Sequence, residues 1–178
     1  LPQVDNKSKD FFFLRRLQGD RAAETIVDLC KNRLPKNMGI PTDQIQVLSP
    51  TRKHITGTSQ LNAMLQAALN PPSPDKLERR YGSTVFREGD RVMQVKNNYD
   101  ILWREDGGTD SGMGMFNGDI GVIRSVDREC ITVDFDGKIV EYSPDMLGEL
   151  EPAFAVTVHK AQGSEYRAVI LALSLIHI

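Results

Sequence analysis

Residues 155–166 concentrate the side chains in this sequence that are best suited to chemistry. They supply a hydroxyl, an imidazole, an ammonium, an amide and a carboxylate, from Thr157, His159, Lys160, Gln162 and Glu165. We expect residues 156–162 to be helical, with Gly163 in the turn just past the helix end. A buried strand is then predicted for residues 168–173. This arrangement would bring the polar groups to one edge of a sheet; the alternative is a solvated helix end with ordinary surface charges.

A second candidate group follows an apolar segment at residues 45–48, which we predict to be a short strand. The polar loop after it contains Thr51, Arg52 and Lys53. Arginine is planar and always charged, so Arg52 can hold a phosphate through two parallel hydrogen bonds. Taken alone, the same loop is equally typical of a solvated surface. His54 has no Cys or carboxylate at ligand spacing, and we expect no metal site.

A third candidate group lies at residues 97–99, where Asn97 and Asn98 precede Tyr99. Amides and one aromatic ring are chemistry suited to single-stranded nucleic acid, because any base can stack on a ring. The structural alternative is a turn made by the two asparagines, with Tyr99 half-buried. Trp103 stands beside a Gly-rich stretch, and there packing is the more ordinary role.

Two segments with an α/β pattern must position the first two groups. A buried strand is predicted at residues 11–14, followed by an amphipathic helix that Asp20 caps and Pro35 ends. After the strand at residues 45–48, Ser59 is expected to cap a second helix that ends at Asn70. Alternation of strands and helices is typical of an α/β domain.

The pattern changes to short strands from about residue 85. Strands are predicted at residues 91–95, 120–126, 130–135 and 138–142, with Asp136 and Gly137 as a type I′ hairpin turn. The Gly-rich residues 106–114 are expected to form a mobile loop. We predict a small β barrel at residues 116–150, inserted into the α/β domain, with residues 152–173 rejoining the sheet that holds residues 45–48.

Composition limits the function further. Among 178 residues, 40% are hydrophobic and 26% are charged, which is typical of a globular protein. The net charge of -2 gives no overall basic field, so any contact with nucleic acid must be local. Cys30 and Cys130 lie far apart in apolar segments, and we expect reduced thiols in a cytoplasmic protein. No segment is apolar and long enough to predict a membrane span.

The pattern TxHKxQGxE at residues 157–165 resembles motif V of the RecD-like superfamily 1 (1B) DNA helicases. Residues 46–53 are similar to motif IV of that family, and Gly57, Leu61 and Asn62 are similar to its continuation. The two similar segments also stand in the right order along the chain.

The resemblance extends into the β region. Residues 86–99 are similar to the family's stretch before an inserted barrel, and residues 116–121 to the beginning of that barrel. In all, the resemblance covers about residues 10–172.

The resemblance implies a fold of the α/β class, a RecA-like second motor domain of the P-loop-NTPase type with an inserted SH3-like β barrel. We therefore expect residues 1–100 to be the first segment of the RecA-like domain 2A. Residues 101–150 would be the SH3-like subdomain 2B, and residues 151–178 the second segment of domain 2A, with motif V.

The resemblance also implies roles for individual residues. The expected nucleotide-binding residues are Lys160, Gln162, Gly163 and Glu165. The expected DNA-binding residues are Thr51, Arg52, Asn97, Tyr99, Thr157 and His159. In the family, this edge of the sheet lies between the nucleotide and the single strand.

For the parent protein, the resemblance implies an ATP-dependent helicase that moves 5′ to 3′ on single-stranded DNA. ATP and Mg²⁺ would be its cofactors, and its partners would be the N-terminal RecA-like domain of the same chain and RecBC-type nuclease subunits, in recombination or repair. The sequence contains no GxxxxGK(S/T) loop, no acidic pair after an apolar strand and no motif VI arginine. We therefore expect no ATPase activity from this chain alone.

Two alternatives remain open at this stage. One is the helicase part of a conjugative relaxase, which an upstream domain with tyrosines and a histidine cluster would reveal. The other is a non-catalytic module that binds nucleic acid or protein through its SH3-like barrel, although such a module has no reason to specify TxHKxQGxE. Residues 173–178 read as the translation of CTG TCT CTT ATA CAC ATC, a transposon end used as a sequencing adapter, and we expect them not to be native.

Overall fold

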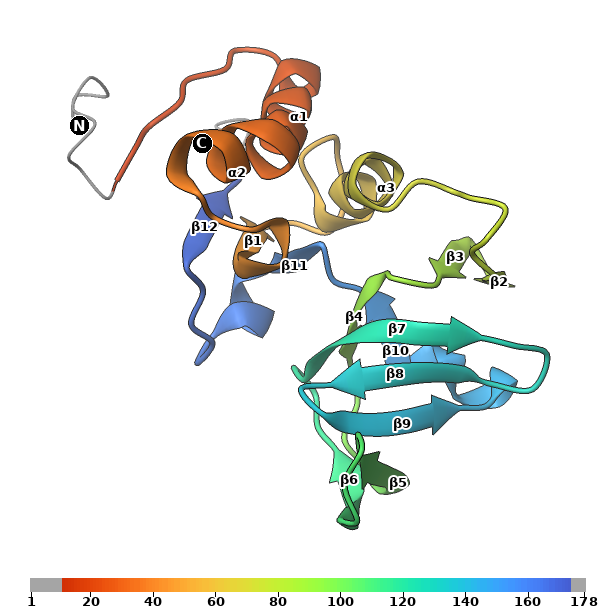
Figure 1. Cartoon of the computed structure of the whole chain (residues 1–178). Helices are drawn as coiled ribbons and strands as arrows, with labels where there is room; N and C mark the ends of the chain where they lie inside the picture. The colour runs from red at the N-terminus through yellow and green to blue at the C-terminus, as the bar shows by residue number, and fades with distance from the viewer. Residues whose placement is uncertain (1–10, 174–178) are drawn as a thin grey trace.

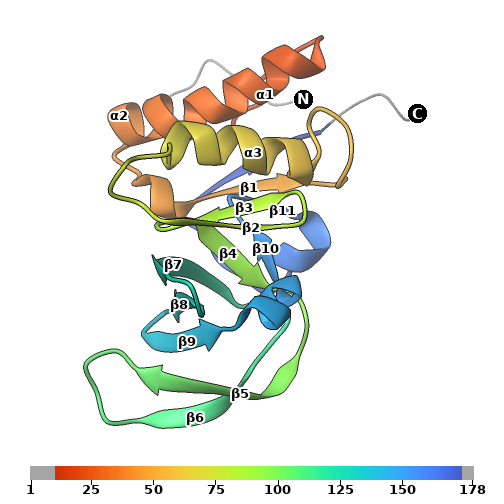
Figure 2. The same cartoon turned by 90° about the vertical axis from the view of Figure 1, so that its right-hand side faces the viewer.

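The computed structural model describes residues 11–173 and has three layers. Helices cover one face of a small parallel sheet, and a larger antiparallel sheet lies on the other side of it, as Figures 1 and 2 show. The mixture of an α/β part with a β part agrees with the fold class predicted from the sequence. Of the expected non-native residues, Ser174 to Ile178 lie outside the described residues.

The first helical segment differs from its prediction. α1 (Gly19–Asp28) passes through a π-helical turn (Leu29–Arg33) into α2 (Leu34–Met38), so the chain stays helical beyond Pro35. Pro35 lies directly after the π-helical turn, at the beginning of α2. The change of hydrogen-bond pattern at such a turn lets the helix accommodate a residue without an N–H. The residue before α1 is Gln18, without a side-chain cap, and Asp20 lies inside the first turn. The prediction of Asp20 as the cap was wrong.

The predicted strand at residues 11–14 is also wrong. Residues 11–16 are irregular, and the side chains of Phe11, Phe12 and Leu14 are exposed. An apolar run of four residues has no periodicity from which to tell a buried strand from an exposed segment.

The parallel sheet joins segments far apart in the sequence. β1 (Ile45–Ser49) lies between β11 (Ala155–Thr157) and β12 (Ala168–Leu171), and both neighbours are parallel to it. This confirms that the chain rejoins the sheet of residues 45–48 after the β region. β12 is half-exposed rather than buried, because it is an edge strand of the described sheet.

Helices α1 and α3 (Thr58–Leu69) pack on one face of the parallel sheet. Their shared core is made of small and aliphatic side chains from α1, the turn after it, β1, α3 and β11. Its members include Ala23, Ile26, Cys30, Ile45, Val47, Leu61, Leu65 and Ala155. α3 ends at Asn70, as predicted, but it starts after Gly57, and Ser59 does not act as its cap.

The large sheet holds seven strands in the order β10-β4-β7-β8-β9-β5-β6. Along the chain they are β4 (Arg91–Gln94), β5 (Asn98–Glu105), β6 (Ser111–Met115), β7 (Ile120–Val126), β8 (Ile131–Phe135), β9 (Lys138–Tyr142) and β10 (Leu150–Pro152). A separate hairpin, β2 (Glu78–Tyr81) and β3 (Thr84–Arg87), precedes them. Within the described residues this order is open, with β10 and β6 at its edges, so the closed barrel predicted from the sequence is not found.

Two turns of the large sheet test the prediction directly. Asp136 and Gly137 both have positive φ, 53° and 87°, which confirms the type I′ turn between β8 and β9. The Gly-rich residues 106–114 are not a loop throughout, because Ser111–Met115 pairs with β5 as β6. A Cβ on Gly112 would lie 2.6 Å from the Trp103 ring, so glycine here lets the ring lie across the neighbouring strand.

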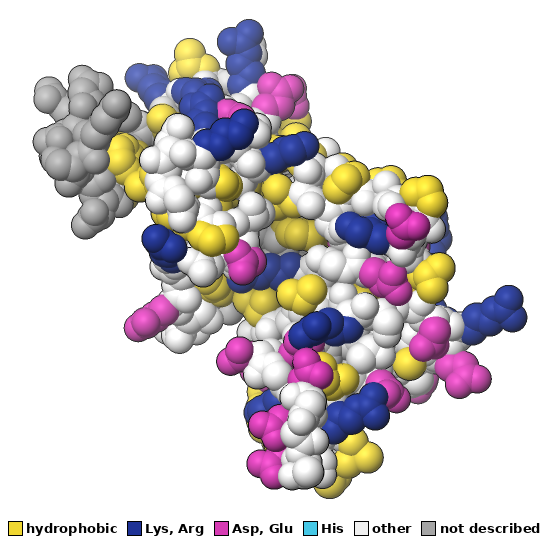
Figure 3. Space-filling view, viewed as in Figure 1, with side chains coloured by type: hydrophobic (Ala, Val, Ile, Leu, Met, Phe, Trp, Pro, Cys, Tyr) yellow, Lys and Arg dark blue, Asp and Glu magenta, His cyan; other side chains and the backbone are white. Residues whose placement is uncertain are grey.

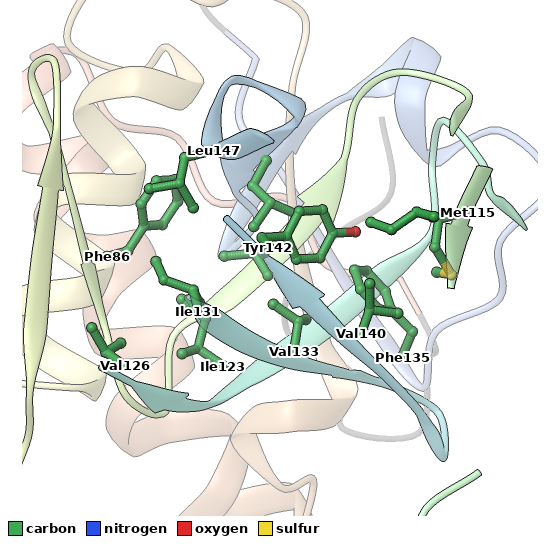
Figure 4. Packing of buried hydrophobic residues seen from close by; sticks show 13 residues of the cluster. Phe86, Met115, Ile123, Val126, Ile131, Val133, Phe135, Val140, Tyr142 and Leu147 are labelled. Carbon is green, nitrogen blue, oxygen red and sulfur yellow. The ribbon is translucent and has the colours of Figure 1, made fainter. Parts of the chain in front are cut away.

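The large sheet has a hydrophobic core of its own. Thirteen buried side chains form it, and Figure 4 shows Tyr142 near its middle, with Phe86 and Leu147 at one end and Met115 at the other. Trp103 packs against this core, as expected for a packing role, and Lys138 lies 5.0 Å from its ring centroid. A smaller group, Met93, Ala153, Val156 and Ala161, fills the space between the large sheet and the parallel sheet.

Candidate functional site

The candidate site lies where β1 and β11 end together. Ser49 pairs with Thr157 in the parallel register, so the loop at residues 49–57 and the turn at residues 157–163 start side by side. We call these two segments the carboxyl edge. Ligands of open parallel sheets bind beyond the carboxyl ends of strands, because side chains from several loops converge there.

The helix predicted at residues 156–162 is wrong in its first part. Pairing with β1 extends the strand to Thr157, and only Val158–Ala161 form a short 3-10 helix. Short apolar runs are ambiguous between helix and strand, and here the neighbouring strand decides. Gly163 has φ of 85°, as expected for the residue in the turn after a helix.

The loop at residues 49–57 folds back on itself. The Ser49 hydroxyl donates to the carbonyl of Thr56 at 2.8 Å and accepts from the amide of Thr51 at 3.2 Å. Gly57 is required for this closure, because a Cβ there would overlap the backbone carbonyl of Lys53. The first amides of α3 then donate to carbonyls of this loop, from Thr58 at 3.0 Å and from Ser59 at 3.2 Å. The loop is therefore a defined structure that holds Arg52.

One carboxylate joins the two halves of the carboxyl edge. Arg52 Nη2 lies 2.6 Å from Glu151 Oε2, and Lys160 Nζ lies 3.2 Å from the same oxygen. Burial by itself raises the pKa of Glu151, but the hydrogen bonds and charges of Arg52 and Lys160 together hold it below its ordinary value. Glu151 is thus an anion at neutral pH. Sequence reasoning missed it, since nothing in the local pattern distinguishes it from other surface glutamates.

Asn62 holds β11 in place from the side of α3. Its amide nitrogen donates to the carbonyls of Ala155 at 2.8 Å and Pro152 at 3.1 Å, and its oxygen accepts from the amide of Ala155 at 2.8 Å. The Asn62 side chain is buried away from water, so its amide and these backbone groups of β11 need each other as hydrogen-bond partners. In the sequence, Asn62 is part of the family resemblance, which assigns it no role. A structural role could have been inferred from its position, because a polar amide stands there beside the apolar face of a predicted helix.

The remaining residues of the two segments are accessible. Arg52, Lys53 and His159 are exposed, whereas Thr51, Thr157 and Lys160 are half-buried. The Thr51 hydroxyl donates to the carbonyl of Lys53 at 3.1 Å, which adds to the order of the loop. Gln162 and Gly163 are exposed in the turn that follows. Because β1 and β11 end side by side, the structure brings together Thr51, Arg52, Thr157, His159 and Lys160.

Glu165 lies elsewhere. It lines a hollow of about 700 Å³ at the amino ends of β1 and β12, together with Asp43, Arg91, Asp119, Asp136 and Tyr166. Arg91 donates to the carbonyl of Ile45 at 3.1 Å and lies 5.9 Å from the ring centroid of Tyr166. Burial lowers the pKa of Arg91. Of the expected nucleotide-binding residues, Lys160 thus lies at the carboxyl edge and Glu165 in this hollow.

Tyr99 lies on β5 of the large sheet, and Asn97 lies just before this strand. Tyr99 is exposed rather than half-buried, and its ring meets that of Phe116 edge to face, with centroids 5.8 Å apart. The Asn97 oxygen accepts from the amide of Asn117 at 2.9 Å, and its nitrogen donates to the Tyr99 hydroxyl at 3.3 Å. Asn97 therefore orders this corner of the sheet and positions an accessible ring.

On the face seen in Figure 3, Lys and Arg are interspersed with Asp and Glu over the large sheet, so this part of the surface has no extended basic field. With a net charge of -2 for the whole chain, attraction for an anion depends on local groups such as those of the carboxyl edge. Between residues 11 and 173, no group of three or more His, Cys, Asp or Glu is arranged to hold a metal ion. The described helices include none with the length and apolar character needed to cross a membrane.

Comparison with known proteins supports the resemblance. Residues 61–135 match the family model described as the ATP-dependent RecD-like DNA helicase SH3 domain. The ATP-dependent RecD2 DNA helicase of Deinococcus radiodurans is 37% identical over 133 residues, which are 75% of this chain and 16% of that protein. An uncharacterized protein of Methanocaldococcus jannaschii is 27% identical over 172 residues, 86% of this chain and 14% of that protein. The chain thus spans about a sixth or less of the length of these relatives.

Similar chains also occur among solved structures. The Bacteroides Pif1 helicase in complex with ADP-AlF3 and single-stranded DNA has a TM-score of 0.47 and 16% identity, covering 86% of this chain and 39% of that one. A second Pif1 structure, from a study of DNA unwinding at forked duplex DNA, has a TM-score of 0.46 and 17% identity over 90% of this chain and 42% of its own. The family match and the RecD2 alignment confirm what the motifs predict: this chain is a relative of the ATP-dependent RecD-like DNA helicases and contains their SH3 domain.

Proposed function

We propose that this chain is part of the motor of an ATP-dependent DNA helicase and that its carboxyl edge contacts the backbone of single-stranded DNA. The observation that carries the proposal is the parallel pairing of Ser49 with Thr157. It brings the loop of Arg52 beside the turn of His159 and Lys160, so that segments about 100 residues apart in sequence form one polar edge.

The chemistry of this edge suits phosphate rather than bases. Guanidinium and ammonium groups donate charge-assisted hydrogen bonds to phosphate oxygens, and the hydroxyls of Thr51 and Thr157 add neutral donors. A motor that moves along a strand must bind every sequence alike, which contacts to the backbone allow. The exposed ring of Tyr99, with Asn97 beside it, adds a surface on which a base stacks.

In the parent protein, we propose a RecA-like domain 2A from residues 1–100 and 151–178, interrupted by an SH3-like domain 2B at residues 101–150. Gln162, Gly163 and Glu165 would face a nucleotide held with Mg²⁺ between this domain and an N-terminal RecA-like domain. Lys160 is proposed for the strand instead, because it shares Glu151 with Arg52 at the carboxyl edge. Translocation from 5′ to 3′ on single-stranded DNA is proposed from the RecD resemblance.

A salt titration of single-strand affinity tests the DNA-binding edge. We expect Arg52→Ala to weaken binding of this chain to oligothymidine and oligoadenosine equally, and to reduce the slope of log affinity against log salt by about 0.7, the value for one phosphate contact. Arg104→Ala is the matched control, because Arg104 also pairs with a glutamate, Glu141 at 2.9 Å, but lies on the large sheet. Equal slopes for the wild-type chain and Arg52→Ala would show that this edge does not face the strand.

Two further measurements address the motor. Thr157→Ala and His159→Ala in the parent protein should reduce unwinding more than they reduce strand affinity, because motif V is expected to couple the strand to the nucleotide. The isolated chain should show no ATP hydrolysis with or without single-stranded DNA. DNA-stimulated hydrolysis by a clean preparation, lost in Glu165→Ala, would contradict this expectation.

A further inference from the structure

The carboxyl edge already contains an anion of its own. Both carboxylate oxygens of Glu151 accept from Arg52 Nη2, at 2.6 Å each, and Oε2 also accepts from Lys160 at 3.2 Å. The side chains of Arg52 and Glu151 are about half-exposed, at 55% and 41%, so solvent and ligands reach the pair. Two cations on separate segments are therefore held by one carboxylate at the surface where we place the DNA backbone.

A carboxylate and a phosphodiester offer the same interaction to these cations. Each presents anionic oxygens that accept charge-assisted hydrogen bonds from a guanidinium or an ammonium group. With Glu151 in place, the three side chains together carry a charge of about +1; without its charge, Arg52 and Lys160 together carry +2. A phosphate that approaches the edge must compete with Glu151 for the same donors.

We infer that Glu151 is an internal competitor of the DNA phosphate, which occupies Arg52 and Lys160 in the free chain and releases them when a strand binds. This inference rests on the proposed function. It adds to that function a residue that weakens the binding of the strand. Weakening is useful in a motor, because a strand that is bound too tightly is not released at each step.

The position of Glu151 shows which part of the molecule controls this competition. Glu151 lies on β10, where it pairs with Met93 of β4 in the large sheet. Arg52, in contrast, lies on the loop that follows β1 of the parallel sheet, and Lys160 lies on the short 3-10 helix that follows β11. The carboxylate is therefore presented by one sheet to cations of the other, and the large sheet determines how strongly the edge holds a phosphate.

Glu151→Gln tests the inference in the full 178-residue chain. The amide keeps the shape of the side chain and removes its charge. We expect tighter binding of a fluorescent oligothymidine and a salt slope steeper by about 0.7, which corresponds to an affinity about fivefold higher at 0.1 M salt through one more released counterion. Glu151→Asp, which keeps the charge, should bind nearly as the wild-type chain does.

Glu141→Gln is the matched control, because it removes the same charge from another glutamate–arginine pair of the large sheet, at Arg104. Equal affinities of Glu151→Gln and Glu141→Gln, with Arg52→Ala still reducing the slope, would overturn the inference and leave the proposed function intact. A gain that persists fully in Arg52→Ala/Glu151→Gln would also overturn it, since the released cation would not be responsible. Absence of binding by the wild-type chain and by Glu151→Gln would overturn both, provided that circular dichroism shows each to be folded.

Discussion

The parallel sheet and the large sheet reach a buried core in different ways. In the large sheet, buried and exposed residues alternate, as in β8 (Ile131–Phe135), and three of its six described strand pairings, β5–β6, β7–β8 and β8–β9, join strands that are consecutive in the chain. In the parallel sheet, the central strand β1 is covered on both faces, and its partner β11 comes from more than 100 residues later. The meander β7–β8–β9 and the hairpin β5–β6 of the large sheet therefore depend on local pairings. Both pairings of the parallel sheet, in contrast, form only once the chain has returned, and the candidate site lies at the carboxyl edge of that sheet.

The largest expected effect concerns the core of the large sheet. Phe86→Ala removes a ring that is 1% exposed, and we expect it to cost about 3–5 kcal/mol of unfolding free energy. Phe116→Ala removes the same ring from a position that is 48% exposed, where the cost should stay below about 1 kcal/mol. Urea titrations followed by circular dichroism measure both. Similar losses in the two variants would mean that this core does not carry the stability we assign to it.

An intermediate effect is expected at the contact between α3 and β11. Asn62→Ala leaves the amide of Ala155 and the carbonyl of Pro152 without their partner, and we expect a loss of about 1–3 kcal/mol in urea unfolding. Asn37→Ala, at an exposed position of α2, serves as the control and should change little. Because β11 carries the turn of His159, single-strand affinity should fall in Asn62→Ala as well. An unchanged single-strand affinity would show that DNA binding does not depend on the position of β11.

A smaller effect is expected in the loop of Arg52. In Gly57→Ala the new methyl group meets the backbone carbonyl of Lys53, which cannot rotate away, so the loop must shift at a cost of about 1 kcal/mol. In Gly19→Ala the nearest atom is a side-chain methyl of Ile55, which can move aside. Thermal unfolding and strand affinity should therefore decline in Gly57→Ala only, and equal behaviour of the two variants would argue against a rigid loop.

The smallest effect concerns pH. The folded-state pKa of Glu151 is lowered, so its ion pairs stabilise the fold above the unfolded pKa of about 4.3 and lose this effect as pH falls through the folded pKa. Since the pair is about half-exposed, we expect Glu151→Gln to lower stability by less than about 1 kcal/mol at pH 7 and by less still at pH 3. Thermal melts at the two pH values measure the difference. A difference that grows toward acid pH would mean that the carboxylate is not held by these cations.

Predictability from the sequence follows the same division between the sheets. β7, β8 and β9 were predicted because alternating residues and the turn at Asp136 and Gly137 both depend on local sequence. β6 was missed because glycine has low strand propensity, and only the pairing with β5 and the packing of Trp103 explain its place.

In the α/β part, β1 and the apolar face of α3 were predicted from composition and period. Val156 and Thr157 of β11 were predicted as helix, because the pairing of this strand with β1 depends on residues far away in the sequence. For the candidate site, the sequence predicts Arg52 and His159 through the resemblance and their chemistry. The role of Glu151 emerges only when β10 and the two loops are placed together in space.

The passage from β10 to β11 consists of Ala153 and Phe154 alone. Ala153 is fully buried, and its amide donates to the carbonyl of Arg91 at 2.8 Å. A joint this short, with its backbone bonded into the sheet, has little torsional freedom. A turning force applied to the large sheet would therefore be transmitted directly to β11 instead of being absorbed by a linker. In mechanical terms, this joint couples the two sheets rigidly.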